Sequence, residues 1–174
     1  MATLATKCVN NKLLTYDPNR KVRVRFSLMP QAWSDILEPN TSKIIDRIKA
    51  VNNFHRAGYD VHLNFSPVIV HDGSRKLYTE LFNQVNDIID DRFKPYVKAE
   101  VIFLTHNVKM HKHNLKHDAE AEKLLWKEDI QEAKTSQYGG NNLRYKHELK
   151  SMYIDRFKKL HNSIISWNKI RYIF

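Results

Sequence analysis

The fold is decided between residues 21 and 82, where the sequence reads KVRVRFSLMPQAWSDILEPNTSKIIDRIKAVNNFHRAGYDVHLNFSPVIVHDGSRKLYTELF. Residues 22–29 alternate apolar and polar side chains, which predicts a strand with one solvated face. Residues 44–54 repeat apolar side chains every three or four positions, which predicts an amphipathic helix. Thr41 and Ser42 precede that helix, and we expect their hydroxyls to cap it.

The same pattern repeats along the chain. Gly58 stands where helices commonly end, and residues 59–70 form the second predicted strand. A second apolar stripe over residues 77–89 predicts another helix, and the apolar run at 99–105 predicts a third strand buried on both faces. Strands that alternate with helices at this spacing indicate an α/β fold with a parallel sheet and right-handed crossovers.

In such folds the chemistry lies at the C-terminal ends of the strands. We therefore expect the functional site among residues 27–29, 71–72 and 105–107.

The rest of the chain adds a helical region at residues 107–126, a turn at 136–142, a basic helix at 143–165 and a short strand at 170–174. Four or five strands are too few for a complete (β/α) barrel, which takes about 250 residues. We therefore predict a single domain over residues 1–174, folded as an incomplete (β/α) barrel with a C-terminal hairpin and helix.

Composition limits the partners and the location. The net charge is +10, with six Lys/Arg in residues 1–25 and eight in residues 142–174, which favours a polyanion such as nucleic acid over the alternative of an ordinary solvated helix face. Cys8 is the single cysteine, which excludes an internal disulfide and suits a reducing cytoplasm. No apolar run approaches the length of a membrane span, so no membrane is expected.

Several short motifs in the first half of the chain carry a family resemblance. In order they are RFS at 25–27, EPNTS at 38–42, RIKA at 47–50, AGY at 57–59, SPVI at 66–69, DG at 72–73 and YTELF at 78–82. With this order and spacing, the chain resembles the C-terminal half of spore photoproduct lyase.

The resemblance implies a radical S-adenosylmethionine enzyme that repairs a thymine dimer in DNA, the spore photoproduct. It also implies a 4Fe-4S cluster held by a C-x-x-x-C-x-x-C motif in the first half of a partial barrel. Cys8 cannot replace three thiolates, so the chain alone carries no cluster ligands and is expected to be inactive without a partner chain that supplies the missing half.

The resemblance assigns two cofactor-binding residues. Lys7 and Ser27 match residues that contact S-adenosylmethionine in the family, and a lysine and a strand-end hydroxyl suit its carboxylate and ribose. A surface lysine and a turn serine are the alternatives.

The hairpin that enters DNA in the family matches residues 136–142, with Tyr138 as the stacking residue and Gln137 where relatives more often have arginine. Ser74 is a second departure, since relatives tend to have tryptophan there. On the basic helix region, we expect DNA contacts from Lys146, Lys150, Lys158 and Lys159.

Histidines offer a weaker signal. His113 and His117 lie four residues apart, as metal ligands on one helix face do, but no convincing third ligand is found and a solvated or DNA-facing surface is preferred, so no metal ligands are assigned. His106, at the end of the third strand, is kept as a site candidate facing the barrel mouth.

The sequence alone therefore leaves two candidate functions open. The first is a spore photoproduct lyase-like radical protein, present as a fragment. The second is a non-catalytic nucleic-acid-binding remnant or accessory protein.

Overall fold

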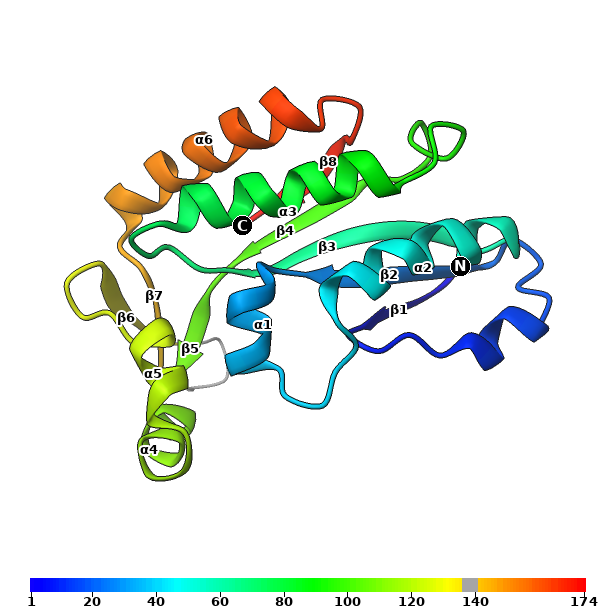
Figure 1. Cartoon of the computed structure of the whole chain (residues 1–174). Helices are drawn as coiled ribbons and strands as arrows, with labels where there is room; N and C mark the ends of the chain where they lie inside the picture. Colours follow the sequence, from blue (N-terminus) through cyan, green and yellow to red (C-terminus); the bar gives the residue numbers. More distant parts are fainter. Residues whose placement is uncertain (136–140) are drawn as a thin grey trace.

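The computed structural model describes residues 1–135 and 141–174, which form two β-sheets with helices around them (Figure 1). The larger sheet has five parallel strands in the order β1-β2-β3-β4-β8. These strands are β1 (Ala2–Thr6), β2 (Val22–Leu28), β3 (Asp60–Val68), β4 (Ala99–Phe103) and β8 (Ile170–Ile173). The predicted α/β fold with a parallel sheet is confirmed.

The three long helices lie on one face of this sheet (Figure 1). They are α2 (Ile44–Arg56), α3 (Ser74–Ile88) and α6 (His147–Ile164). Val24, Phe26 and Leu28 of β2 belong to the core and are at most 1% exposed. Burial of each such side chain contributes about 1.5–3 kcal/mol, which explains why the alternation in β2 fixes which face the helices cover. The intervening polar residues of β2 therefore belong to the opposite face.

The sheet is open, as an incomplete barrel requires. Among the described residues, β1 pairs only with β2, and β8 pairs only with β4. Four of the five residues of β1 are exposed, so this strand presents an unpaired edge to solvent.

The smaller sheet is antiparallel, with strand order β5-β7-β6. Its strands are β5 (Thr105–Asn107), β6 (Gln131–Thr135) and β7 (Asn141–Tyr145), and α4 (Val108–His117) and α5 (Ala119–Leu125) adjoin it (Figure 1). The predicted hairpin is flanked by β6 and β7, while Gln137 and Tyr138 lie outside the described residues.

Two predicted helices have different boundaries. The helical region expected over 107–126 consists of two helices, because Asp118 has a non-helical backbone (φ −154°, ψ 68°) and its carboxylate accepts a hydrogen bond from the Ala121 N–H at the start of α5. The helix expected from 143 starts later, because Leu143 and Tyr145 alternate into the interior as part of β7.

The expected hydroxyl caps of α2 are also wrong. Lys43 is the N-cap residue and makes no side-chain cap bond. Ser42 Oγ accepts from the Val9 N–H, and the Ile44 N–H donates to Gln31 Oε1 (2.8 and 2.7 Å). The sequence reading also missed the short helix α1 (Gln31–Leu37) and the 3₁₀ turn at Asn11–Thr15, both of which are short local segments.

No helix in the described part of the chain combines the length and the apolar character needed to cross a bilayer.

Candidate functional site

Near the C-terminal end of β2, two polar side chains lie together on the face that the helices leave free, one from β2 and one from the middle of β3. Ser27 and Asn64 are neighbours in the register of these strands and are 5% and 6% exposed. Asn64 Nδ2 donates to Ser27 Oγ over 3.3 Å, and Asn64 Oδ1 has no partner within the described residues. A buried acceptor without a partner suits a ligand hydroxyl or ammonium group.

Arg47 holds this strand end in place from α2. Its side chain is fully buried, and its Nη1 donates to the Ser27 carbonyl oxygen (2.9 Å) and to Glu38 Oε2 (2.8 Å). The remaining guanidinium hydrogen bonds go to the Ser42 carbonyl oxygen (2.8 Å), Thr41 Oγ1 (2.6 Å) and Ser34 Oγ (3.3 Å). One arginine thus joins the two motifs RFS and EPNTS, because its five donors fan out in one plane.

Lys7 lies beside this cluster. Its Nζ is 2.9 Å from Glu38 Oε1. The two groups form an ion pair, but the angles do not meet those of a hydrogen bond. The Glu38 side chain is 2% exposed, so its charge is shared between Arg47 inside and Lys7, which is 45% exposed. The structure therefore brings Lys7 and Ser27 into one neighbourhood through Arg47 and Glu38.

A polar network continues along the same face toward β8. Arg25 Nη1 and Arg171 Nη1 donate to the two oxygens of Glu100 (2.5 and 3.0 Å), and the Tyr172 hydroxyl donates to it as well. Burial alone would raise the pKa of Glu100, but these hydrogen bonds and the two guanidinium charges outweigh it and lower the pKa. Glu100 is therefore a carboxylate at neutral pH.

His62 stands on β3 between Asp60 and Asn64. Its Nε2 lies 3.1 Å from Asp60 Oδ1, and its Nδ1 has no partner within the described part of the chain. Burial, with contributions from the nearby Arg23 and Arg171 charges, lowers the pKa of His62 to about 4, against the raising effect of Asp60. The open face of the sheet therefore carries a neutral imidazole beside permanent charges.

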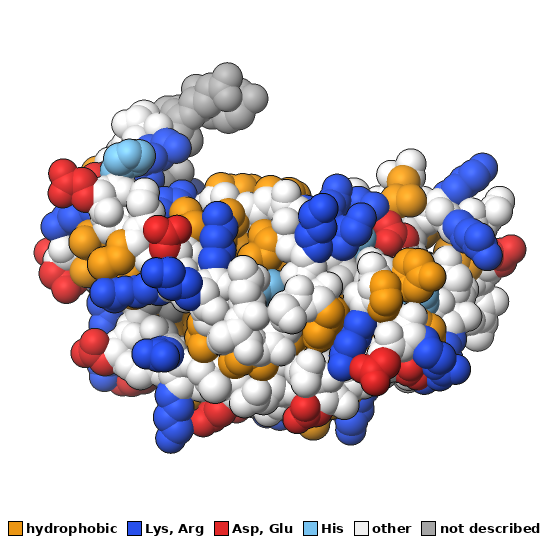
Figure 2. Space-filling view, turned by 90° about the horizontal axis from the view of Figure 1, so that it is seen from above, with side chains coloured by type: hydrophobic (Ala, Val, Ile, Leu, Met, Phe, Trp, Pro, Cys, Tyr) orange, Lys and Arg blue, Asp and Glu red, His pale blue; other side chains and the backbone are white. Residues whose placement is uncertain are grey.

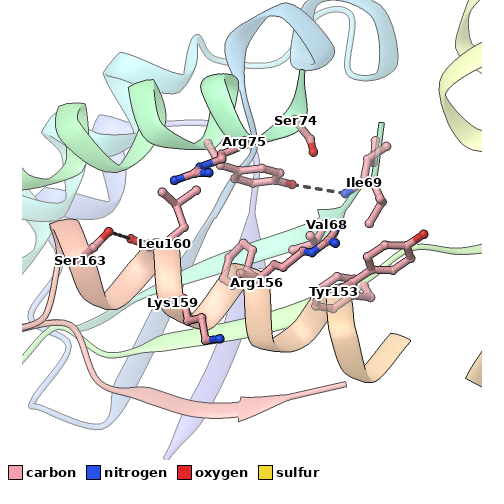
Figure 3. Close-up of a pocket in the computed structure, with 13 residues that line it drawn as sticks. Val68, Ile69, Ser74, Arg75, Tyr153, Arg156, Lys159, Leu160 and Ser163 are labelled. Carbon is pink, nitrogen blue, oxygen red and sulfur yellow. Dashed lines mark hydrogen bonds between the residues drawn. The ribbon is translucent and has the colours of Figure 1, made fainter. Parts of the chain in front are cut away.

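Away from this polar face, a hollow with a volume of about 620 Å³ lies between α3 and α6 (Figure 3). Its apolar lining includes Phe103 and Phe157, and Arg75, Arg156 and Lys159 line it as well. Figure 2 shows the molecule from above, with the Lys and Arg side chains spread among acidic and apolar ones. An anionic group with an apolar part suits this hollow.

The four predicted DNA-facing lysines have different local surroundings. Lys159 lines the hollow, whereas Lys158 does not. Lys146 donates to the Asp129 carbonyl oxygen (2.7 Å). The pKa of Lys150 is lowered by burial and by the charges of Arg144 and Lys134.

His106 differs from its predicted place. It belongs to β5 in the smaller sheet, pairs with Leu143 of β7, and its Nε2 lies 2.9 Å from Glu122 Oε1. His113 and His117 are exposed, with ring centroids 4.5 Å apart, and within the described ranges no third ligand group joins them. The sequence did not indicate that His106, His111 and Glu122 form one group, because no fixed spacing marks residues that only tertiary packing brings together.

The thiolates of an iron–sulfur cluster have no counterpart here. Cys8 is exposed and is the single cysteine in the sequence, whereas such clusters need several. The residues present do not fit a cluster.

Comparison with known proteins assigns the chain to a family. The family model for spore photoproduct lyase matches residues 3–174. A spore photoproduct lyase of Bacillus subtilis is 29% identical over 90 residues, covering 52% of this chain and 26% of the relative. One from Clostridium acetobutylicum is 26% identical over 110 residues, covering 58% of this chain and 33% of the relative.

Solved structures show the same fold. A spore photoproduct lyase mutant with bound AdoMet and dinucleoside spore photoproduct superposes with a TM-score of 0.87 at 22% identity, covering 99% of this chain and 51% of that chain. A spore photoproduct lyase complexed with dinucleoside spore photoproduct gives 0.85 at 21% identity, with the same coverage. The chain spans about half the length of these structures, which agrees with the half-barrel prediction.

Proposed function

The chain belongs to the spore photoproduct lyase family, and we propose that it supplies the second half of a radical S-adenosylmethionine enzyme that repairs spore photoproduct DNA. The observation that carries the proposal is the family match over residues 3–174, together with the polar pair of Ser27 on β2 and Asn64 on β3. With DNA as its partner, the protein is proposed to act in the cytoplasm.

S-adenosylmethionine fits the end of β2 in part. The Ser27 hydroxyl and the unpartnered Asn64 Oδ1 offer hydrogen bonds to ribose or ammonium groups, and Lys7 offers a charge for a carboxylate. When bound, the cofactor supplies the radical chemistry of the family. The role of this chain is then to bind and orient the cofactor, with Arg47 fixing the strand that carries Ser27.

The cluster ligands must come from polypeptide outside these 174 residues, either in the same protein or in a partner chain, because Cys8 is the single cysteine. Radical chemistry is therefore proposed only for the assembly, and the chain alone is proposed to be inactive.

DNA contacts are proposed for Lys146, Lys150, Lys158 and Lys159, with Gln137 and Tyr138 as the residues that reach the lesion. Supporting this, Arg75 and Arg156 lie beside Lys159 at the hollow between α3 and α6, and among the described contacts neither arginine has an acidic partner. Free guanidinium groups bind phosphate well.

The second candidate is a nucleic-acid-binding protein without catalysis. Two observations favour it: Lys7 is engaged by Glu38, a protein carboxylate, and the sequence has a single cysteine. The two candidates differ in cofactor binding, since only the first predicts affinity for S-adenosylmethionine.

The test measures DNA binding by fluorescence anisotropy, with the full chain and duplexes that carry or lack one spore photoproduct, at several salt concentrations. Replacing Lys158 and Lys159 with glutamine should weaken binding and reduce the salt slope by about 2, since each neutralised phosphate contributes about 0.9. The matched control replaces the exposed Lys12 and Lys49, which removes the same charge elsewhere and should leave the slope nearly unchanged.

Absent or salt-independent binding rejects the DNA-facing role. Isothermal titration with S-adenosylmethionine separates the candidates. Binding that weakens in Ser27→Ala supports the enzyme half, and DNA binding without cofactor binding supports the second candidate.

A further inference from the structure

Three polar side chains from three successive elements meet beside the smaller sheet. His106 comes from β5, His111 from α4 and Glu122 from α5. His106 Nε2 lies 2.9 Å from Glu122 Oε1, and His111 Nδ1 lies 2.5 Å from Glu122 Oε2. The three ligand-type atoms all lie within 4.8 Å of one another.

The group is buried and held in position by its neighbours. The side chains of His106, His111 and Glu122 are 10%, 17% and 3% exposed. The His111 ring stacks on Trp126 with ring centroids 3.6 Å apart, and Asn114 Nδ2 donates to Glu122 Oε1 over 2.6 Å. Ligands oriented by such outer contacts are typical of metal sites.

The buried carboxylate of Glu122 has no lysine or arginine beside it within the described residues. No lysine or arginine in the described part of the chain forms an ion pair with it, and its partners are two imidazoles and an amide. A buried carboxylate without a cation is strongly disfavoured, because removing its charge from water costs several kcal/mol. The hydrogen bonds from His106, His111 and Asn114 favour the carboxylate form of Glu122, and a metal ion bound to that carboxylate would compensate its charge.

Two imidazole nitrogens and one carboxylate oxygen are a common three-residue ligand set for Zn²⁺, with water in the fourth position. The partial exposure of His111 leaves a side from which an ion and a water molecule can enter. We propose that His106 Nε2, His111 Nδ1 and the Glu122 carboxylate form a Zn²⁺ site. The ion joins β5, α4 and α5, and so stiffens the part of the molecule that also holds β6 and β7.

The test uses the full chain without a histidine tag, stripped of metal with a chelator, and titrated with Zn²⁺ against a chromophoric competitor. One Zn²⁺ should bind per chain. Substitutions His106→Ala, His111→Ala and Glu122→Gln should each lower the affinity by more than about 100-fold, since loss of an outer-shell partner alone costs 10–100-fold.

The matched control is the double variant His113→Ala/His117→Ala, which removes two exposed imidazoles from α4, the helix that also carries His111. Its affinity should stay within a factor of about 2 of the parent chain, because neither ring belongs to the set. Circular dichroism of each variant verifies that the fold is retained.

A second readout does not depend on changing a ligand. Co²⁺ bound beside His111 should quench the fluorescence of Trp126, and Trp126→Phe should remove this quenching while the binding of one ion per chain is kept. The proposal is overturned if no Zn²⁺ binds, if the three ligand variants bind as tightly as the parent chain, or if the control variant alone loses binding.

Discussion

Replacement of Arg47 by methionine tests whether this residue holds the candidate cofactor end of the sheet. Methionine replaces the unbranched stem of arginine but has no guanidinium group and no charge, so Glu38 would keep its buried carboxylate with Lys7 as the remaining cation. Removing one partner of a buried ion pair typically costs about 3–5 kcal/mol. The Ser27 and Ser42 carbonyl oxygens lose their hydrogen bonds as well, so we expect the free energy of unfolding to fall by at least about 3 kcal/mol.

Urea unfolding of the full chain, followed by circular dichroism and by tryptophan fluorescence, gives this free energy. The matched control is Arg56→Ala, which changes an arginine of the same helix whose side chain is 52% exposed and lies 3.6 Å from Asp90. Exposed pairs contribute little, so the control should lose less than about 1 kcal/mol.

A double-mutant cycle measures the interaction energy between Arg47 and Glu38. Glu38→Gln removes the carboxylate charge, so the double variant with Arg47→Met should lose clearly less than the sum of the two single variants, with a coupling of about 1–3 kcal/mol. Strictly additive losses, or a loss below about 1 kcal/mol for Arg47→Met, would refute the claim that Arg47 and Glu38 form one structural unit.

The remaining predictions concern the titration, the packing and the edge of the sheet. The unfolded-state pKa of His62 is near 6.5 and the folded one is about 4, so the unfolded chain takes up the proton first and stability should fall by at most about 3 kcal/mol as pH drops from 6.5 to 4. Urea unfolding across that range should show a smaller fall for His62→Gln, and an equal fall would contradict the assignment. Tyr145→Phe leaves the Val70 N–H without its acceptor and should cost about 1–3 kcal/mol in thermal or urea unfolding, whereas Tyr153→Phe, whose hydroxyl has no described hydrogen-bond partner, should cost less. The unpaired edge of β1 should cause self-association that rises with concentration and weakens in Leu4→Lys, as light scattering can measure; a monomer at all concentrations would argue against an open edge.

The sequence predicted the central sheet well because its signals are local. The alternation in residues 22–29 and the apolar stripe over residues 44–54 follow from which face each segment buries, and burial is the largest stabilising term. The boundaries of β2 and α2 therefore fell within a residue or two of the predicted segments.

The role of Arg47 could not be predicted from the pattern. In a helix an arginine ordinarily indicates a solvated face, yet Arg47 is fully buried by contacts with residues 5 to 20 positions away in the sequence. The same holds for Thr41 and Ser42, whose hydroxyls serve Arg47 and Val9 instead of capping α2.

The group of His106, His111 and Glu122 was missed for a related reason. Asp118 breaks the predicted helix into α4 and α5, and that break allows Glu122 to turn back toward His111. Periodicity predicts single elements, whereas this group depends on how three of them pack.

The most direct measurement of the central claim is a reassembly assay. The full chain is mixed anaerobically with the cysteine-bearing first half of the Bacillus subtilis relative after cluster reconstitution, and chromatography follows conversion of dinucleoside spore photoproduct to thymidine. The account predicts thymidine only when both parts are present, and less of it with Ser27→Ala. The account is contradicted if this chain yields no thymidine while the two halves of the relative, mixed in the same way, do.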